Sequence, residues 1–373
     1  MGKVKFLAVL VSGILLSVGN LFAESKDVKS LIRRADRGDS QAQFELACYY
    51  AEEEQNQELF EKYIIWAAEN GNIDACLMWS DICFQYKDDL NEAEKYVKIA
   101  ADKGNLLAMV RYGLVKYFKK EYKEAFNAFK LAEEKGDASA NIMLLKMYLS
   151  GLGCEKNEKL AFEHAKKAVA ANIPDGYNEM AQFYRYGIVV KKDMSKAIEL
   201  LEIASSNGIS EATYDLGLIY LDDIKDEKKA FQMFQKAHEM GDANAAYMLG
   251  LCYDQGLGVA EDLQKAFDYY KLAADAGVPP ALFNLACFYA TGELVEKNEE
   301  LAFNLAKQAA DGGFVDAMYV TFRNLVDGFG CEVDYQESHK YLQMAADHGH
   351  PTALKIIEKL KQQKSEKKID KIQ

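Results

Sequence analysis

The sequence is poor in residues that interrupt helices and in the motifs that carry common enzyme chemistry. Only four of its 373 residues are proline, which favours a helical chain because proline breaks helix interiors. Histidine is also scarce, and the one local cluster is His339, His348 and His350, for which turn or surface histidines are a simpler interpretation than a metal site. No HExxH motif, Walker phosphate-binding loop or Lys-Thr-Gly triplet occurs. We therefore expect no enzyme activity, no bound metal and no cofactor.

An excess of basic residues is also missing. The chain has 45 lysines and arginines against 58 aspartates and glutamates, which gives a formal net charge of −13. A protein that binds duplex nucleic acid needs a basic face for the phosphates, so we expect no nucleic-acid partner.

A long apolar run occurs at the N-terminus, from Phe6 to about Val18, after two lysines and before a stretch of small residues. This arrangement predicts a Sec-type signal peptide over residues 1–23, cleaved after Ala23. The alternative is a short uncleaved anchor, but the run is shorter than the roughly 20 residues that a membrane span requires. We expect a periplasmic or secreted protein without stable membrane insertion once the signal is removed.

What the chain has in abundance is one repeated unit. Copies open 32 to 36 residues apart, at Gly38, Gly71, Gly104, Gly136, Asn172, Gly208, Gly241, Gly277 and Gly313. A fixed period of this length indicates a solenoid, in which each unit packs on its neighbours.

The copy that opens at Gly241 shows what each unit contains. Ala245, Leu249 and Tyr253 recur every four residues, which predicts one buried face of a first helix. Apolar residues between Ala266 and Ala273 recur at three and four and predict a second helix. Gly250 lies inside the first helix, where it costs helix propensity, so we expect the partner helix to approach closely there.

These residues carry a resemblance to a known family. The pattern A-x-x-x-L-G-x-x-Y-x-x-G-x-G-V, followed by K-A-x-x-Y-x-x-x-A-A-x-x-G, resembles Sel1-like repeats, which are relatives of the tetratricopeptide repeat. It departs from that pattern at Trp79-Ser80, Asn172 and Thr321-Phe322. The resemblance implies an all-α fold, a right-handed superhelical solenoid of about nine Sel1-like (TPR-like) helix-pair repeats.

The repeat also divides the chain into segments. Residues 24–37 resemble the second helix of a missing half-unit and predict an N-terminal capping helix, and residues 349–360 predict a C-terminal one. The nine repeats occupy residues 38–348. The lysine-rich residues 361–373 contain no aromatic residue, and we expect a disordered tail there.

Seven cysteines in an exported protein raise the question of disulfides. Cys76 and Cys83 would lie about 10 Å apart along one helix, beyond disulfide reach. Cys252 and Cys287 lie on adjacent first helices and are the one pair for which a disulfide stays open. Free, buried cysteines acting as small hydrophobic residues are favoured for the rest.

A solenoid without a catalytic set favours a non-enzymatic exported scaffold or adaptor that binds a protein or peptide, and we expect it to be a monomer. Two alternatives remain: a regulator or inhibitor of a cell-envelope (peptidoglycan) enzyme, and a secreted host-interaction factor. Some secreted Sel1 proteins are associated with β-lactam binding or hydrolysis. That enzyme class is less favoured here, because S-x-x-K occurs only at Ser365–Lys368 and the cysteine pair per repeat is missing.

In related solenoids the first helices line the concave face. The stripe opposite the buried one should then line a partner-binding groove, and we expect its contacts to include Leu107, Arg111, Leu114, Phe118, Asp175, Glu179, Tyr186, Glu211, Asp215, Asp222, Met248 and Leu251. Phe118 and Leu114 are predicted as apolar anchors, and Asp215 and Asp222 as charge contacts for a partner with basic groups. The alternative is a solvated face with stray apolar residues.

Overall fold

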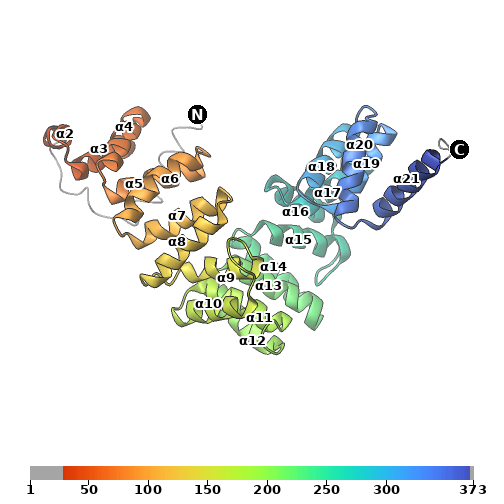
Figure 1. Ribbon diagram of the computed structural model, residues 1–373. Coiled ribbons are helices and arrows are strands. Elements are labelled where there is room, and N and C mark those ends of the chain that lie inside the picture. The colour runs from red at the N-terminus through yellow and green to blue at the C-terminus, as the bar shows by residue number, and fades with distance from the viewer. Residues whose placement is uncertain (1–27, 370–373) are drawn as a thin grey trace. The chain divides into compact units, whose positions relative to one another are not determined.

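The computed structural model describes residues 28–369, so the predicted signal peptide lies outside the described residues. The chain divides into two compact units, residues 1–194 and 195–373, and each is described by itself. Residues 28–369 contain twenty α-helices and one π-helical turn, with no β-strand (Figure 1). The prediction of an all-α solenoid is confirmed.

In unit 1 a lone helix is followed by helix pairs in which each helix packs on the next. The first helices of the pairs are α3, α5, α7, α9 and α11, and the second helices are α4, α6, α8 and α10. Their bounds are α2 (Val28–Asp36), α3 (Ser40–Glu52), α4 (Gln57–Glu69), α5 (Ile73–Gln85), α6 (Leu90–Asp102), α7 (Leu106–Phe118), α8 (Tyr122–Glu134), α9 (Ala140–Ser150), α10 (Glu158–Ala170) and α11 (Pro174–Tyr186).

Unit 2 continues the alternation from the second helix of the fifth repeat, whose first residue still belongs to unit 1. Its first helices are α13, α15, α17 and α19. The bounds are α12 (Met194–Ser206), α13 (Ser210–Leu218), the π-helical turn η1 (Ile219–Ile224), α14 (Glu227–Glu239), α15 (Ala243–Gln255), α16 (Leu263–Asp275), α17 (Pro279–Thr291), α18 (Glu299–Asp311), α19 (Val315–Asp327), α20 (Tyr335–Asp347) and α21 (Pro351–Ile369).

At several repeat boundaries two adjacent residues end one helix and start the next. Before α15, Gly241 adopts a left-handed conformation with φ of 91°, and the Asp242 carboxylate accepts hydrogen bonds from the backbone N–H groups of Asn244 and Ala245. Asn172 keeps the left-handed conformation, with φ of 56°, where the other repeats have glycine. Asparagine tolerates this conformation, so the departure from the repeat pattern leaves the boundary intact.

The tight helix contact predicted at Gly250 is confirmed. A Cβ atom on Gly250 would lie 2.5 Å from the Tyr270 ring of α16, where no real side chain fits. Two other repeats pair a glycine with an aromatic ring in the same way: Gly113 with Phe129, and Gly217 with Phe234. In these three repeats the missing side chain on the first helix makes room for a buried ring on the second.

The loop after α11 contains a strained residue. Val189 has φ of 65°, and the equivalent residues in three other long loops are Gly153, Gly258 and Gly330, with φ between 69° and 75°. A β-branched residue in the left-handed region is a conformational outlier. The fifth repeat therefore carries local backbone strain that those three loops avoid.

The C-terminal end corrects one prediction. Helix α21 runs from Pro351 to Ile369 and so extends past residue 360, where the capping helix was expected to end. The segment is rich in lysine, glutamine and glutamate, which are good helix formers, and neither glycine nor proline follows Pro351 to stop the helix.

All seven cysteines are free. Four of them are buried, as expected for small hydrophobic residues, and burial raises the pKa of Cys252 to about 12. Cys252 and Cys287 do not pair, and Cys287 is solvent-exposed.

Candidate partner-binding surfaces

Two pairs of neighbouring first helices in unit 1, α5 with α7 and α9 with α11, contact each other through their side chains. The surface that the first helices of a unit present is called here the first-helix face. Arg111 on α7 pairs with Asp81 on α5 at 2.7 Å, and Lys146 on α9 pairs with Glu179 on α11 at 3.0 Å. Two of the predicted partner contacts, Arg111 and Glu179, therefore have their charges balanced by neighbouring helices of the same chain. They connect adjacent repeats in addition to facing solvent.

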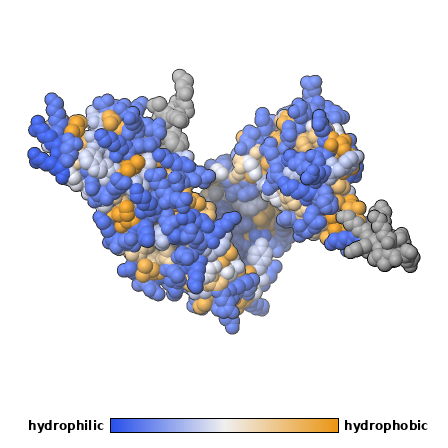
Figure 2. Space-filling model, turned by 45° about the horizontal axis from the view of Figure 1, so that its top comes forward, coloured by the Kyte–Doolittle hydropathy of each residue, from blue (hydrophilic) through white to orange (hydrophobic). Residues whose placement is uncertain are grey.

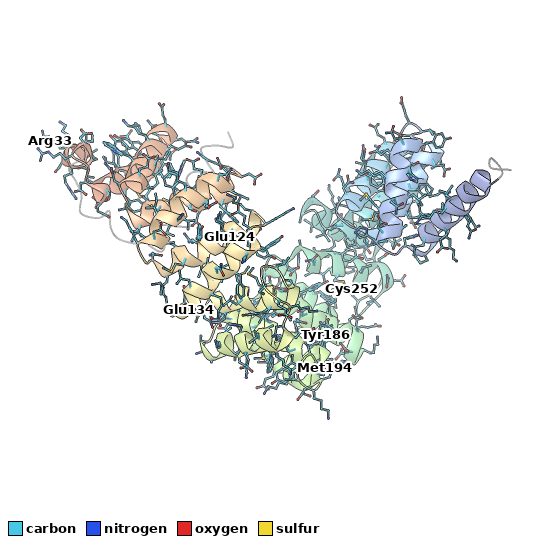
Figure 3. All side chains as sticks on the ribbon, in the orientation of Figure 1. Arg33, Glu124, Glu134, Tyr186, Met194 and Cys252 are labelled. Carbon is cyan, nitrogen blue, oxygen red and sulfur yellow. The ribbon has the colours of Figure 1, made fainter. Side chains whose placement is uncertain are left out.

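Large exposed side chains lie on the same face. Phe118 is 56 % exposed and meets Phe84 of α5 edge-on, with ring centroids 5.0 Å apart. Leu107 is exposed as well, and Tyr186, the last residue of α11, is 63 % exposed. Tyr186 is labelled in Figure 3. Leu114 is half-buried and packs on the core between α7 and α8. Of the two predicted apolar anchors, Phe118 is thus far more accessible than Leu114.

The predicted acidic contacts differ in their surroundings. Asp175 of α11 and Glu211 of α13 are exposed, whereas Asp215 is half-buried and already interacts within the chain. Asp222 is exposed but lies in η1, not in a regular α-helix. A π-helical turn is wider than an α-helical one, so an extrapolation at 100° per residue does not give the direction of Asp222.

Met248 corrects the predicted groove. It is buried and packs with Phe234 and Leu249 in the core of unit 2. Leu251 is half-buried at the edge of the same cluster. Met248 is therefore a core residue that a partner cannot reach in this conformation, because the apolar stripe of α15 is wider than the pattern of every fourth residue indicated.

Two pockets flank α17 on the first-helix face of unit 2, and the repeat pattern alone does not reveal them. The polar pocket, of about 190 Å³, lies between α15 and α17, and its lining includes Asp254, Tyr270, Asn284, Thr291 and Glu293. The apolar pocket, of about 280 Å³, lies between α17 and α19, and its lining includes Phe283, Ala286, Ala306, Val320 and Phe329. Cys287 lines both pockets.

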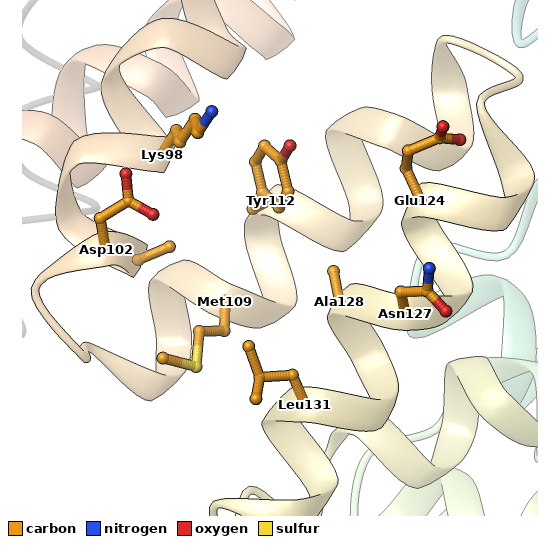
Figure 4. Close-up of a pocket in the computed structure, with 9 residues that line it drawn as sticks. Lys98, Asp102, Met109, Tyr112, Glu124, Asn127, Ala128 and Leu131 are labelled. Atoms are coloured by element: carbon orange, nitrogen blue, oxygen red, sulfur yellow. The ribbon is translucent and has the colours of Figure 1, made fainter.

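A third recess lies among the second helices of unit 1 and is called here the second-helix cleft. It has a volume of about 310 Å³, and its floor is formed by Met109 and Tyr112 of α7 between side chains of α6 and α8 (Figure 4). Leu131 of α8 is 45 % exposed at its edge. On the face of the molecule seen in Figure 2, hydrophobic side chains form small scattered patches among hydrophilic ones.

A half-buried ion-pair network connects the third repeat to the second. The Lys116 ammonium lies 2.6 Å from carboxylate oxygens of both Glu94 and Glu121, and Lys119 contacts the second Glu94 oxygen. Burial alone would raise the pKa of Glu94, but hydrogen bonds from the two lysines outweigh it and lower that pKa. The hydrogen-bonded carboxylates in turn raise the pKa of Lys116 against the opposing effect of burial. The network keeps all four groups charged at neutral pH.

Seven segments of the chain match the Sel1 repeat: residues 80–105, 138–173, 174–209, 210–242, 243–278, 279–314 and 315–350. Together they cover more than half of the chain. The chain belongs to the Sel1 repeat family. Helix pairs of the same kind continue outside the matched segments, for example α3 with α4 and α7 with α8.

Solved Sel1 repeat structures resemble this one. A Sel1 repeat protein from Oxalobacter formigenes is 30% identical, with a TM-score of 0.58 over 64% of this chain and 99% of that chain. A protective antigen present in uropathogenic Escherichia coli strains, which displays an SLR fold, is 26% identical, with a TM-score of 0.51 over 94% of this chain and 78% of that chain.

Curated relatives match a smaller part of the chain. An exopolysaccharide production negative regulator of Rhizobium meliloti is 30% identical over 128 residues, which are 31% of this chain and 48% of the relative. An uncharacterized protein of Neisseria meningitidis is 33% identical over 85 residues, 23% of this chain and 18% of that relative. The chain thus spans less than half the length of either curated relative.

Within residues 28–369, no three histidine, cysteine, aspartate or glutamate side chains gather closely enough to hold a metal ion. In the same range, no helix combines the length and the apolar character that crossing a membrane would require.

Proposed function

We propose that this Sel1 repeat protein is an exported, non-enzymatic scaffold that binds a protein or peptide along the first-helix faces of its units. The observation that carries the proposal is the combination on these faces of exposed aromatic rings, such as Phe118 and Tyr186, with two pockets beside α17. Exposed apolar groups and concave recesses mark interaction sites in soluble proteins. Stacked repeats supply the extended surface on which such sites can act together.

Export forms the second part of the proposal and is supported by the apolar N-terminal run between the lysines and Ala23. It predicts that the protein recovered from its native cell begins at Glu24. N-terminal sequencing or intact mass spectrometry measures this directly. Protein that retains Met1 would contradict export through a cleaved signal.

Proximity labelling in the native cell tests the binding function. The wild type is compared with Phe118→Ser, which removes an exposed ring from the first-helix face, and with the matched control Leu131→Ser, which removes an exposed apolar residue from the second-helix cleft. We expect Phe118→Ser to lose specific neighbours while Leu131→Ser keeps them. The same neighbours for all three proteins would refute binding through Phe118, and no reproducible neighbour for the wild type would refute the scaffold function.

A second candidate is a regulator of the cell envelope, and it rests on the relatives from two Rhizobium species whose names describe negative regulation of exopolysaccharide production. Deletion of the gene should then raise the amount of extracellular polysaccharide, and complementation should restore it. Unchanged polysaccharide would count against this candidate. The third candidate, a secreted host-interaction factor, has support from the similarity to the uropathogenic Escherichia coli antigen. It predicts that proximity labelling recovers proteins of a host cell.

A further inference from the structure

The polar and apolar pockets beside α17 are the same structural site in two consecutive repeats. Five of the seven lining residues of the polar pocket have an equivalent 36 positions later in the lining of the apolar pocket. Four of these five change from polar to apolar, and Phe288 changes to Asn324. The four replacements by apolar residues, from the polar to the apolar pocket, are Asp254 to Ala290, Tyr270 to Ala306, Asn284 to Val320, and Glu293 to Phe329. One scaffold position has thus acquired two contrasting chemistries on either side of a single helix.

The apolar pocket is explained by two small side chains that face each other across a helix pair and leave space between the helices. Where other repeats place glycine against a buried ring, as Gly250 does against Tyr270, the eighth repeat places Ala286 opposite Ala306, and both are buried in the pocket lining. A dry cavity of about 150 Å³ is enough to bind benzene. The volume of about 280 Å³ here therefore has room for one large apolar side chain.

The polar pocket carries negative charge that the chain does not balance. The Tyr270 hydroxyl donates a hydrogen bond to Oδ2 of Asp254 at 3.1 Å, which leaves the other carboxylate oxygen available. Glu293 is exposed on the loop after α17. Within residues 28–369 neither carboxylate forms an ion pair, and Asn284 adds an amide oxygen to the same lining. This set suits a guanidinium group, whose planar donors match carboxylate and amide oxygens.

We propose that α17 forms a bipartite docking site for a peptide segment of the partner, with an arginine in the polar pocket and a large apolar side chain in the apolar pocket. This rests on the proposed scaffold function and specifies the segment that the scaffold recognises. The two pockets lie on either side of α17 and share Cys287, so about one helix diameter, about 10 Å, separates them. In a polyproline II segment, residues i and i+3 share a face and lie about 9 Å apart. The recognised segment therefore has the form Arg-x-x-Phe, or the same pair in reverse order.

Fluorescence anisotropy with the full mature chain tests the proposal. The probes are labelled peptides of sequence Gly-Ser-Arg-Pro-Pro-Phe-Ser-Gly and Gly-Ser-Phe-Pro-Pro-Arg-Ser-Gly. Two control versions of each replace its arginine with glutamate or its phenylalanine with alanine. We expect saturable binding of at least one parent probe and at least a tenfold loss for each of its controls. No binding of either parent, or equal binding of the controls, would overturn the bipartite site.

Variants of the protein test the location of the site. Ala286→Gly/Ala306→Tyr recreates the Gly250 and Tyr270 pair of the preceding repeat and so fills the apolar pocket with a packing arrangement that the fold already uses. Asp254→Asn/Glu293→Gln removes the charge of the polar pocket, and Glu296→Gln, an exposed position outside both pockets, is the matched control. Both double variants should bind the successful parent probe at least tenfold more weakly, while Glu296→Gln binds as the wild type does.

Alkylation of Cys287 gives a measurement that needs no variant. Its thiol is exposed and lines both pockets, so a bound probe should slow its reaction with iodoacetamide several-fold in peptide mass mapping. Unchanged Cys287 alkylation at saturating probe would place the peptide elsewhere and overturn the assignment. The proposed scaffold function fails on a different result, the absence of reproducible neighbours in the cell, so the two failures are distinguishable.

Discussion

Substitution of Gly250 by alanine tests how tightly the helices of one repeat are fitted together. The added Cβ atom would lie 2.5 Å from the Tyr270 ring, and the ring is 1% exposed, so it has no solvent into which it can move freely. Overpacking of this kind costs about 1–3 kcal/mol. Against that, alanine gains about 1 kcal/mol over glycine in helix propensity. We expect a net loss of about 0–2 kcal/mol from Gly250→Ala alone.

The effect of Gly250→Ala on the free energy of unfolding should have the opposite sign once the Tyr270 ring is absent. In a Tyr270→Ala background the clash cannot occur, so Gly250→Ala should stabilise the chain by the propensity gain of about 1 kcal/mol. The two backgrounds then differ by about 1–3 kcal/mol, and a double-mutant cycle isolates this coupling. The Ala286 and Ala306 pair of the next repeat shows that the fold accommodates alanine at both positions.

Urea denaturation followed by far-UV circular dichroism is the suitable assay, because both tryptophans, Trp66 and Trp79, lie in unit 1 and would not report on α15. Hydrogen exchange of α15 and α16 peptides adds local free energies, which matter because repeats of a solenoid can unfold separately. A coupling below about 0.5 kcal/mol, within ordinary additivity, would refute the argument. It would mean that Tyr270 moves aside at no cost.

Two further predictions concern single residues. Val189→Gly should raise the denaturation midpoint. It removes about 1–2 kcal/mol of strain from the left-handed backbone conformation, and the greater chain entropy of glycine in the unfolded state costs only about 0.5–1 kcal/mol. An equal or lower midpoint would show that the backbone there is unstrained. Glu94 has a pKa below its ordinary value of 4.5, so the folded state binds fewer protons than the unfolded one, and its contribution is present above that value and is lost as the pH falls below it. Glu94→Gln should therefore reduce the loss of unit 1 stability between about pH 5 and 3, measured by tryptophan fluorescence at several urea concentrations; an acid decline equal to that of the wild type would contradict the role of Lys116 and Lys119.

The sequence predicted the fold because the features that specify it are local and periodic. Ala245, Leu249 and Tyr253 mark a buried stripe through spacing alone, and the reason for Gly250 could be inferred because a glycine inside a helix needs an explanation. The end of α21 could not be predicted in the same way, since lysine-rich residues suit both a solvated helix and a disordered segment.

The candidate site was less predictable, because exposure depends on neighbours that the repeat pattern does not describe. The rule of opposite faces placed Phe118 and Tyr186 on the surface but also selected Met248, which the adjoining helices cover. It does not give the direction of Asp222, because η1 departs from regular α-helical geometry there. The pockets beside α17 depend on pairs of positions in different helices, such as Ala286 with Ala306. A comparison of residues 36 positions apart would have shown the exchange of Tyr270 for Ala306, although not the space that it leaves.

The pairing of a glycine with a ring inside a repeat has a consequence for how such proteins diversify. Replacing that pair by two alanines needs only two substitutions and leaves the backbone, the helix boundaries and both neighbouring repeats in place. A solenoid can therefore gain or lose a pocket at one repeat independently of the other repeats. Selection or design can therefore change the binding specificity of the array one repeat at a time. The eighth repeat, where Ala286 and Ala306 line a pocket, is an existing example.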